Sequence, residues 1–272
     1  MTTISATSPT LAPPAALAPT IRAFSYWMLQ YRRVWRASFV ISVLNPLLFL
    51  VGIGAGLGRL VDHHAPAAIA GVPYVAFFAP GLLAAASMQT GFLESSGRVW
   101  RAASWEGAYR GAVTTPLDPE QIMDGHVLFM AFRLATSGAA FIAVMALFGA
   151  ARSWWTIAVL PAAVLTGLAF AIPAAAWGVT VTRSQQINMA FRFVIMPLYM
   201  FSGTFFAITQ LPEWIRWVAY VLPLYHGVEL CRTLSLGTAT LGGSPVHVGY
   251  LLVLSIVGFV VARRNYRKVL HP

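Results

Sequence analysis

Few residues of this chain could do covalent chemistry. Among its 272 residues Lys268 is the only lysine and Cys231 the only cysteine. A P-loop needs a lysine inside a glycine-rich turn to hold phosphates, so the chain cannot be a P-loop ATPase by itself. A single cysteine excludes an intrachain disulfide and a cysteine-based metal cluster. The six histidines lack the spacing of a helical zinc motif, and HExxH and GxSxG elements are absent. We expect no catalytic residue, no metal and no cofactor bound by this chain.

The charged residues distinguish two kinds of transporter. An ion-coupled carrier needs a lone acid near the membrane midplane, whereas the eight Asp and Glu residues map to loops, span ends or a broken outer segment. An ion-coupled secondary transporter is therefore the alternative and not the first hypothesis. Arg133 is the one basic residue expected within the bilayer. Three alternatives remain open for this residue. Arg133 lies deep in the bilayer, its side chain extends to the inner interface, or the third span begins later than about residue 123.

Most of the chain consists of long apolar segments, and these segments would hold the residues named above. The chain is 58% hydrophobic and 10% charged, against about 25% charged residues in soluble domains. Because the runs reach roughly 20 residues, they predict helices and not barrel strands. We predict an all-α membrane protein whose transmembrane domain covers 37–262, between a disordered cytoplasmic tail at 1–20 and a basic cytoplasmic tail at 263–272. Its six spans are expected at about 37–57, 73–93, 123–149, 154–181, 188–206 and 246–262.

The distribution of basic residues predicts the orientation. Of the 18 Lys and Arg residues, all but five fall on the side that holds both termini. Four of these five, Arg59, Arg152, Arg216 and Arg232, lie on the outer side, and the fifth is Arg133. This asymmetry places both termini in the cytoplasm. The basic residues form short, dispersed clusters, so we expect no nucleic-acid partner.

The first predicted helix, at 21–36, is amphipathic. Trp27 and Trp35 lie on its apolar side, and Arg32, Arg33 and Arg36 lie on the other. Such a helix suits the membrane interface, where its aromatic rings contact lipid. The alternative is that this segment is only the flank of the first span.

The inner loop between spans two and three contains a second amphipathic segment, from Ser96 to Ala112. Three aromatic residues in this segment favour contact with a cytoplasmic partner over a solvated connector. Asp118 or Pro119 is expected to begin the next helix as an N-cap. The candidate contact residues are Arg98, Trp100, Arg101, Trp105, Glu106 and Arg110.

Pro212 and Pro223 break the apolar stretch from Ile208 to Leu236. We predict a pair of short re-entrant helices that dip into the outer leaflet in place of a seventh span. Glu229 and Arg232 are three residues apart on one helical face and are expected to pair.

Two of these stretches resemble the type-2 ABC transporter permeases, and the nearest branch is that of nodulation lipo-oligosaccharide and daunorubicin-type drug exporters. One stretch is the inner loop, Glu94 to Leu117. The other begins at Pro197–Phe206 (PLYMFSGTFF) and continues through Leu211–Arg216 (LPEWIR) and Leu222–Leu230 (LPLYHGVEL). The resemblance covers roughly 21–268.

The resemblance implies an exporter in the bacterial inner membrane that carries a drug, polyketide, glycolipid or lipo-oligosaccharide. Its partners would be a separate ATPase subunit, which binds ATP and Mg, and a second permease copy or a paralogue. The inner-loop residues would form the ATPase-coupling helix. Met196, Met200, Phe201 and Phe205 would face the substrate pathway, or would pack only against lipid. The outer gate would comprise Gly203, Pro212, Glu213, Trp214, Pro223, Glu229 and Arg232.

Overall fold

The computed structural model describes residues 17–53, 56, 71–240 and 242–270, and every regular element in these ranges is helical. Most of the tail predicted at 1–20, the end of the first predicted span, and the loop of His63 and His64 lie outside these ranges. The long helices are α1 (Leu17–Ile53), α3 (Tyr74–Trp100), α5 (Pro119–Leu147), α6 (Thr156–Gly178) and α11 (Gly243–Leu270). The shorter ones are η3 (Arg101–Trp105), α4 (Ala108–Ala112), α7 (Ser184–Ala190), η4 (Phe191–Ile195), α8 (Met196–Phe201), η5 (Ile208–Gln210), α9 (Glu213–Val221) and α10 (Pro223–Leu236).

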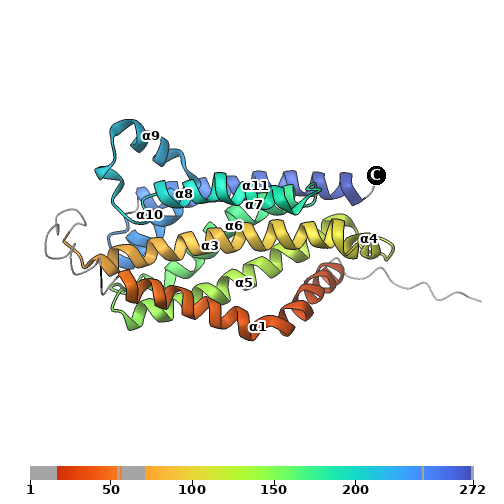
Figure 1. Ribbon diagram of the computed structural model, residues 1–272, viewed down its shortest axis with the longest axis horizontal. Helices are drawn as coiled ribbons and strands as arrows, with labels where there is room; N and C mark the ends of the chain where they lie inside the picture. Colours follow the sequence, from red (N-terminus) through yellow and green to blue (C-terminus); the bar gives the residue numbers. More distant parts are fainter. Residues whose placement is uncertain (1–16, 54–55, 57–70, 241, 271–272) are drawn as a thin grey trace, which may run out of the picture.

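The long helices form an elongated bundle around α3 (Figure 1). Among the residues that the structure describes, five helices are long and apolar enough to cross a membrane, and the one built on α3 is the most buried. Close approach of small residues explains this burial, because a side chain at Gly91 would collide with the backbone of Gly167 on α6. We call the end of the bundle that holds α4 the α4 end, and the opposite one the α9 end.

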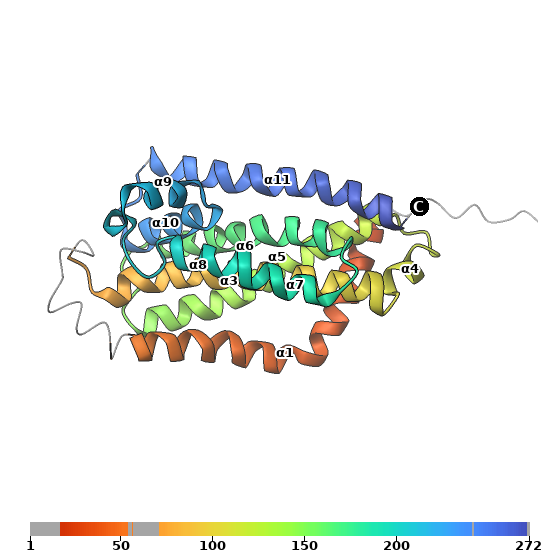
Figure 2. The ribbon, with the colours of Figure 1, turned by 45° about the horizontal axis from the view of Figure 1, so that its top comes forward.

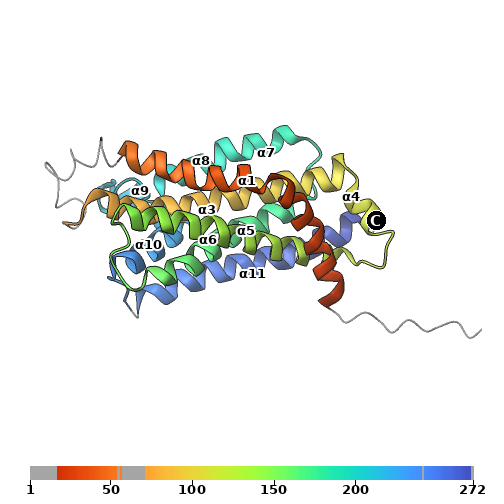
Figure 3. The same cartoon turned by 90° about the horizontal axis from the view of Figure 1, so that it is seen from below.

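Helix α1 is continuous for 37 residues and contains Pro46. The predicted boundary between an interfacial helix at 21–36 and a span from 37 is therefore a change of direction within one helix. Figure 3 shows the N-terminal part, in dark red, crossing the bundle at the α4 end, whereas the rest runs along it. Gly125 of α5 permits this crossing, because a side chain there would collide with Ala23 and the backbone of Phe24.

The predicted fifth span is shorter and less regular than expected. Helix α7, the π-helix η4 and α8 follow one another without a break over residues 184–201. This segment is not among the five helices that satisfy the length and hydropathy requirement within the described ranges. Its first turns carry Gln185, Gln186 and Asn188, and Arg192 follows, so its apolar part is short. Figure 2 nevertheless shows it running beside the long helices of the bundle.

Two helices extend beyond the predicted spans. Helix α3 continues past residue 93 through η3 to Trp105, so the inner-loop segment at 96–112 is largely its extension. The basic tail predicted at 263–272 is helical up to Leu270, and Tyr266 and Leu270 are buried. In both cases packing against neighbouring helices continues the helix beyond its most apolar part.

The local end signals are confirmed. Helix α5 begins at Pro119, and the backbone N–H of Asp118 donates to the Gln121 side chain at 3.0 Å, which completes one half of a capping box. Pro212 immediately precedes α9, and Pro223 is the first residue of α10. Proline is tolerated at this position because the N–H groups of the first helical turn have no partner within the helix. Two short helices are therefore present between residues 212 and 237, and their entry into the outer leaflet stays a prediction.

Candidate functional site

The α4 end presents an exposed group of residues from the predicted coupling segment. The side chains of Arg101, Glu106 and Arg110 are exposed, and Trp105 is 78% exposed. Trp100 is half-buried, with its ring centroid 6.4 Å from that of Trp105. Arg98 is placed differently, because it lies on the body of α3 and pairs with Glu94 at 3.2 Å. We call Arg101, Trp105, Glu106 and Arg110 the inner tip.

A tight turn and two anchors hold the inner tip in place. Gly107 has a φ of +65°, which only glycine adopts without strain, and it turns the chain from η3 into α4. The Ser104 hydroxyl donates to the Val181 carbonyl at 3.3 Å. Tyr109 of α4 is 2% exposed and packs against Tyr266 and Trp27. The tip is therefore exposed at its surface and packed at its base.

The residues predicted for the interfacial helix divide between the inside and the outside of the protein. Trp27 is 2% exposed and its ring stacks on Phe129, so it is a core residue and not the lipid anchor that its position on the wheel predicted. Arg32, Arg33, Trp35 and Arg36 are exposed, and the Arg36 guanidinium lies 5.7 Å from the Trp35 ring centroid. The helical wheel identified the apolar face correctly, but α5 covers part of it.

The four predicted pathway residues do not share one surface. Met200 and Phe201 of α8 are exposed, and Met196 is half-buried. Phe205 follows α8 and packs between Tyr199 and Phe78, with centroid distances of 4.9 and 5.5 Å. The structure thus leaves Met200 and Phe201 available to a ligand, to lipid or to another chain, and it assigns Phe205 to packing.

Arg232 connects three elements at the α9 end. As predicted, it pairs with Glu229, with Nη1 3.4 Å from Oε2. It also donates from Nη2 to the Gly203 carbonyl at 2.6 Å and from Nε to the Phe77 carbonyl at 3.2 Å. Its guanidinium carbon lies 3.9 Å from the Phe77 ring centroid. The predicted gate residues Gly203, Glu229 and Arg232 therefore form one cluster, which also includes Phe77 of α3.

The other predicted gate residues stand apart from this cluster. Pro212, Glu213 and Trp214 are exposed at the beginning of α9, and Pro223 is half-buried at the beginning of α10. Helix α9 lies on the outside of the bundle (Figure 1), whereas α10 buries Leu224, Val228 and Cys231. The pair of helices thus consists of an exposed member and a packed one.

A histidine pair joins α10 to α11 and was not predicted. The Nδ1 atoms of His226 and His247 are 2.8 Å apart, so that one donates a proton to the other. Tyr250 stacks on the His226 ring at a centroid distance of 4.0 Å. The two histidines are 21 residues apart in the sequence, and no local pattern indicates that they meet.

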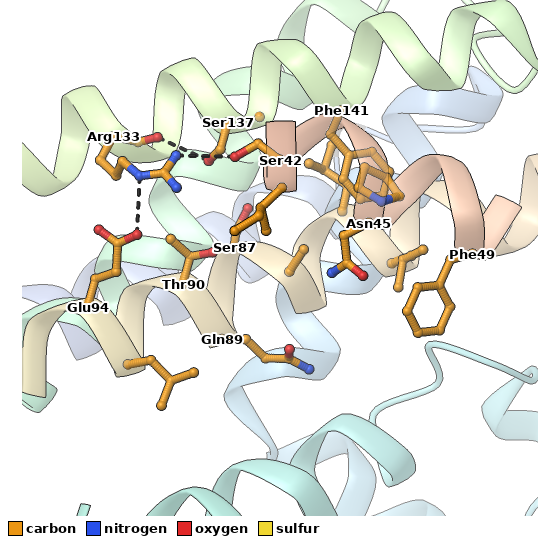
Figure 4. Close-up of a pocket in the computed structure, with 17 residues that line it drawn as sticks. Ser42, Asn45, Phe49, Ser87, Gln89, Thr90, Glu94, Arg133, Ser137 and Phe141 are labelled. Atoms are coloured by element: carbon orange, nitrogen blue, oxygen red, sulfur yellow. Dashed lines mark hydrogen bonds and ion pairs between the residues drawn. The ribbon is translucent and has the colours of Figure 1, made fainter. Parts of the chain in front are cut away.

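A pocket of about 250 Å³ lies between α1, α3 and α5 (Figure 4). Arg133 of α5 and Glu94 of α3 lie at one end, with Nε and Oε1 3.2 Å apart, and the Ser42 hydroxyl of α1 accepts from Arg133 Nη1 at 3.4 Å. The Arg133 side chain is only 7% exposed. Helix α5 begins at Pro119, so Arg133 lies about half-way along this helix.

The rest of the pocket combines polar and apolar residues. Its lining includes Ser42, Asn45, Ser87, Gln89, Thr90 and Ser137, together with Ile41, Phe49, Leu82, Leu83, Leu93 and Phe141. The sequence indicated Arg133 as unusual and Asn45 as a neighbour of the proline in α1. It did not reveal their common site, because the three helices that form the pocket are separated by long stretches of chain.

Comparison with known proteins gives one consistent result. The profile of the ABC-2 type transporter family matches residues 21–236. Nodulation protein J of Rhizobium leguminosarum bv. viciae is 30% identical over 257 residues, covering 89% of this chain and 94% of the relative. Nodulation protein J of Rhizobium meliloti is 27% identical, with 90% and 91% covered. The inner membrane transport permease YadH of Escherichia coli is 23% identical, with 85% and 87% covered.

Proposed function

This chain belongs to the ABC-2 type transporter family, and from that premise we propose that it is the membrane-spanning permease subunit of an ATP-binding-cassette exporter. In this proposal a separate ATPase subunit binds ATP and Mg, and the permease moves an amphipathic or lipid-like molecule out of the cytoplasm or the inner leaflet. The family match favours this function over an ion-coupled secondary transporter.

The course of the chain supports six spans with both termini on one side. Helix α6 ends at the α4 end of the bundle, and α11 begins at the opposite end (Figure 2). Between them the chain covers that distance through the 18 residues of α7, η4 and α8, which extend roughly 27 Å as a helix. This length is close to the thickness of a hydrocarbon core, about 30 Å. We therefore assign the fifth span to residues 184–201.

The inner tip is the observation that supports an ATPase partner. Trp105 is a large aromatic residue that is almost fully exposed next to Arg101 and Glu106. Exposed aromatic and arginine residues on a rigid base are typical of binding hot spots. The relative YadH is named an inner membrane transport permease, which favours the same membrane for this chain. The excess of basic residues at the termini and the inner loop favours a cytoplasmic inner tip.

We propose that ATP-driven closure of the ATPase subunits moves the inner tip and that α3 carries this movement across the bilayer. Helix α3 contacts the cluster around Arg232 directly, because the Phe77 carbonyl accepts a hydrogen bond from Arg232. Met200 and Phe201 would then face the pathway at the interface with a second permease copy or a paralogue. Drugs, polyketides, glycolipids and lipo-oligosaccharides all suit such apolar and aromatic walls.

The test is a tagged pull-down from native membranes in mild detergent, followed by an ATPase assay of the co-purified proteins. We expect a stoichiometric nucleotide-binding subunit with vanadate-sensitive activity. A clean preparation without any ATPase, obtained at native expression levels, would reject the exporter function and direct attention to the ion-coupled alternative.

A further inference from the structure

We propose that the pocket between α1, α3 and α5 binds an amphiphile with a single anionic head group, and that the head lies beside Arg133. The inference deepens the proposed function by naming a ligand class for this permease. It rests on the charges around Arg133, on the polar side chains that line the pocket and on the apolar rim.

Two arginines share one carboxylate at one end of the pocket. Glu94 accepts a hydrogen bond through Oε1 from Arg133 Nε at 3.2 Å, and its other oxygen, Oε2, lies 3.2 Å from Arg98 Nη2 as an ion pair. Glu94 is also the only acidic residue in the pocket lining, as far as the described residues show. The group therefore carries a net charge of about +1 in a region of low dielectric constant, where an uncompensated charge is costly. An anionic group next to Arg133 would compensate this charge, whereas a cationic head would be repelled.

Hydrogen-bonding side chains line the pocket beside Arg133. Among them are Asn45, Ser87 and Thr90. Figure 4 shows Asn45 on α1 and Ser87 and Thr90 on α3 around the same space. Lipid tails offer no hydrogen bonds to such groups, whereas a polar head group does. Phosphate or carboxylate oxygens accept from an amide N–H and from hydroxyls as well as from a guanidinium.

The dimensions and the rim of the pocket point to an amphiphile instead of a free ion. Its volume of about 250 Å³ is below the range of roughly 300–1,000 Å³ usual for whole ligands, so it would hold a head group and leave a tail outside. Ile41 and Phe49 of α1 and Leu93 of α3 line it and are exposed. An acyl or other apolar tail would contact these residues in the position that membrane lipid takes.

The binding test uses the purified full-length chain in a neutral maltoside detergent. Native mass spectrometry would compare the retention of phosphatidylglycerol, which carries one negative charge, with that of phosphatidylcholine of identical chains. We expect one phosphatidylglycerol to be retained with roughly a tenfold preference over phosphatidylcholine. Equal retention of the two lipids would overturn the proposal.

A series of charge variants separates binding in the pocket from general lipid adhesion. Arg133→Gln removes the net positive charge and should reduce the preference to about one, whereas Glu94→Gln raises the charge and should increase the preference beyond that of the wild type. Loss of fold cannot imitate these opposite changes. Arg152→Gln, which removes an exposed arginine outside the pocket, is the matched control and should leave the ratio unchanged. A preference that is the same in all three variants would overturn the proposal.

Two sources could supply such a head group, a resident membrane lipid or the transported molecule. Proteoliposomes that contain the complete ATPase complex and labelled phosphatidylglycerol distinguish them. ATP-dependent movement of the label across the bilayer identifies a transported molecule, and a retained label that does not move identifies a resident lipid. Either result agrees with the assigned pocket. The binding test needs no ATPase, so its failure would leave the proposed exporter function unaffected. Failure to find an ATPase in the pull-down would likewise leave the lipid-binding proposal unaffected.

Discussion

Arg232 is the residue on which most contacts at the α9 end converge. Its guanidinium reaches the Gly203 and Phe77 carbonyls as well as Glu229. Arg232→Ala would leave both carbonyls without this donor and Glu229 without its partner. We expect a loss of about 2–4 kcal/mol in stability, measured as a lower thermal unfolding temperature in detergent.

Glu229→Gln is the matched variant for this prediction, because Arg232 then keeps both carbonyl contacts. We expect it to lose less than half as much stability as Arg232→Ala. Equal losses in the two variants would mean that the ion pair, and not the pair of carbonyl contacts, stabilises this end of the bundle.

The histidine pair predicts a dependence on pH. Burial, followed by the adjacent His247 ring, lowers the pKa of His226 below its ordinary value of 6.5. Tyr225, Tyr250 and Glu229 are the other titratable groups around the pair. Because the folded state disfavours protonation, the contribution to stability is complete above pH 6.5 and is lost as the pH falls through the lowered pKa.

We therefore expect the unfolding temperature to fall as the pH is lowered below about 6.5, with α10 loosening from α11. His226→Asn should flatten this part of the pH profile. Thermal unfolding of both proteins across the range is the measurement. An equally steep profile in the variant would assign the dependence to other groups.

At the residue scale, local pairs could be predicted and distant ones could not. Glu229 and Arg232 occupy neighbouring positions on one helix, so helical geometry alone indicated their pair. The partner of Arg133 is 39 residues away, and its choice depends on how α3 packs against α5. Trp27 shows the same limit, since the wheel predicts an apolar face but not the element that covers it.

At the scale of elements, the inner tip predicts different effects for two neighbouring tryptophans. Trp105→Ala should leave the unfolding temperature unchanged, because the side chain is exposed, and should uncouple ATP hydrolysis from transport in the reconstituted complex. Trp100→Ala removes a half-buried ring that packs against the main core and should lower stability by about 1–3 kcal/mol. Normal transport by Trp105→Ala would remove the coupling role from the tip.

Helix starts could be predicted from the sequence, whereas the extension of two helices beyond the predicted spans could not. Asp118, Pro212 and Pro223 act through their own backbone and side chains, so the sequence indicates them directly. The extension of α3 to Trp105 depends on Val99, Ala102 and Ala103, which are buried against other helices. The extension of α11 beyond residue 262 likewise depends on Tyr266, which packs against Tyr109 of α4. Hydropathy does not report such tertiary contacts.

At the scale of the whole molecule, the arrangement predicts a labelling pattern. Cys231 is the only cysteine and is buried, so single cysteines introduced elsewhere can be labelled selectively. With six spans, Arg101→Cys, Arg183→Cys and Arg264→Cys should react only from the cytoplasmic side of membrane vesicles. Trp214→Cys should react only from the outside.

The decisive residue in this experiment is Arg183, which lies between α6 and α7. Reaction of Arg183→Cys and Trp214→Cys from the same side would mean that residues 184–201 do not cross the membrane. The six-span fold would then be wrong, although the five long helices would remain.

The overall class of the molecule could be predicted, because composition and the length of apolar runs reflect the solvent around each helix. The order of helices in the bundle could not, since it depends on close contacts such as that of Gly91 with Gly167. The pocket beside Arg133 follows from this order and was therefore not visible in the sequence.

The π-helices η3 and η4 have a consequence for how this chain tolerates insertions and deletions. A π-turn accommodates one residue more than an α-turn over the same length, so each marks a position where a single-residue deletion can restore regular helix. In a regular α-helix, where each residue turns the chain by about 100°, a deletion rotates everything that follows it. A deletion within Phe191–Ile195 would instead be absorbed by the π-turn and would leave Met200 and Phe201 facing the same neighbours. The two π-helices are thus the positions at which the loss of one residue changes the packed surfaces least.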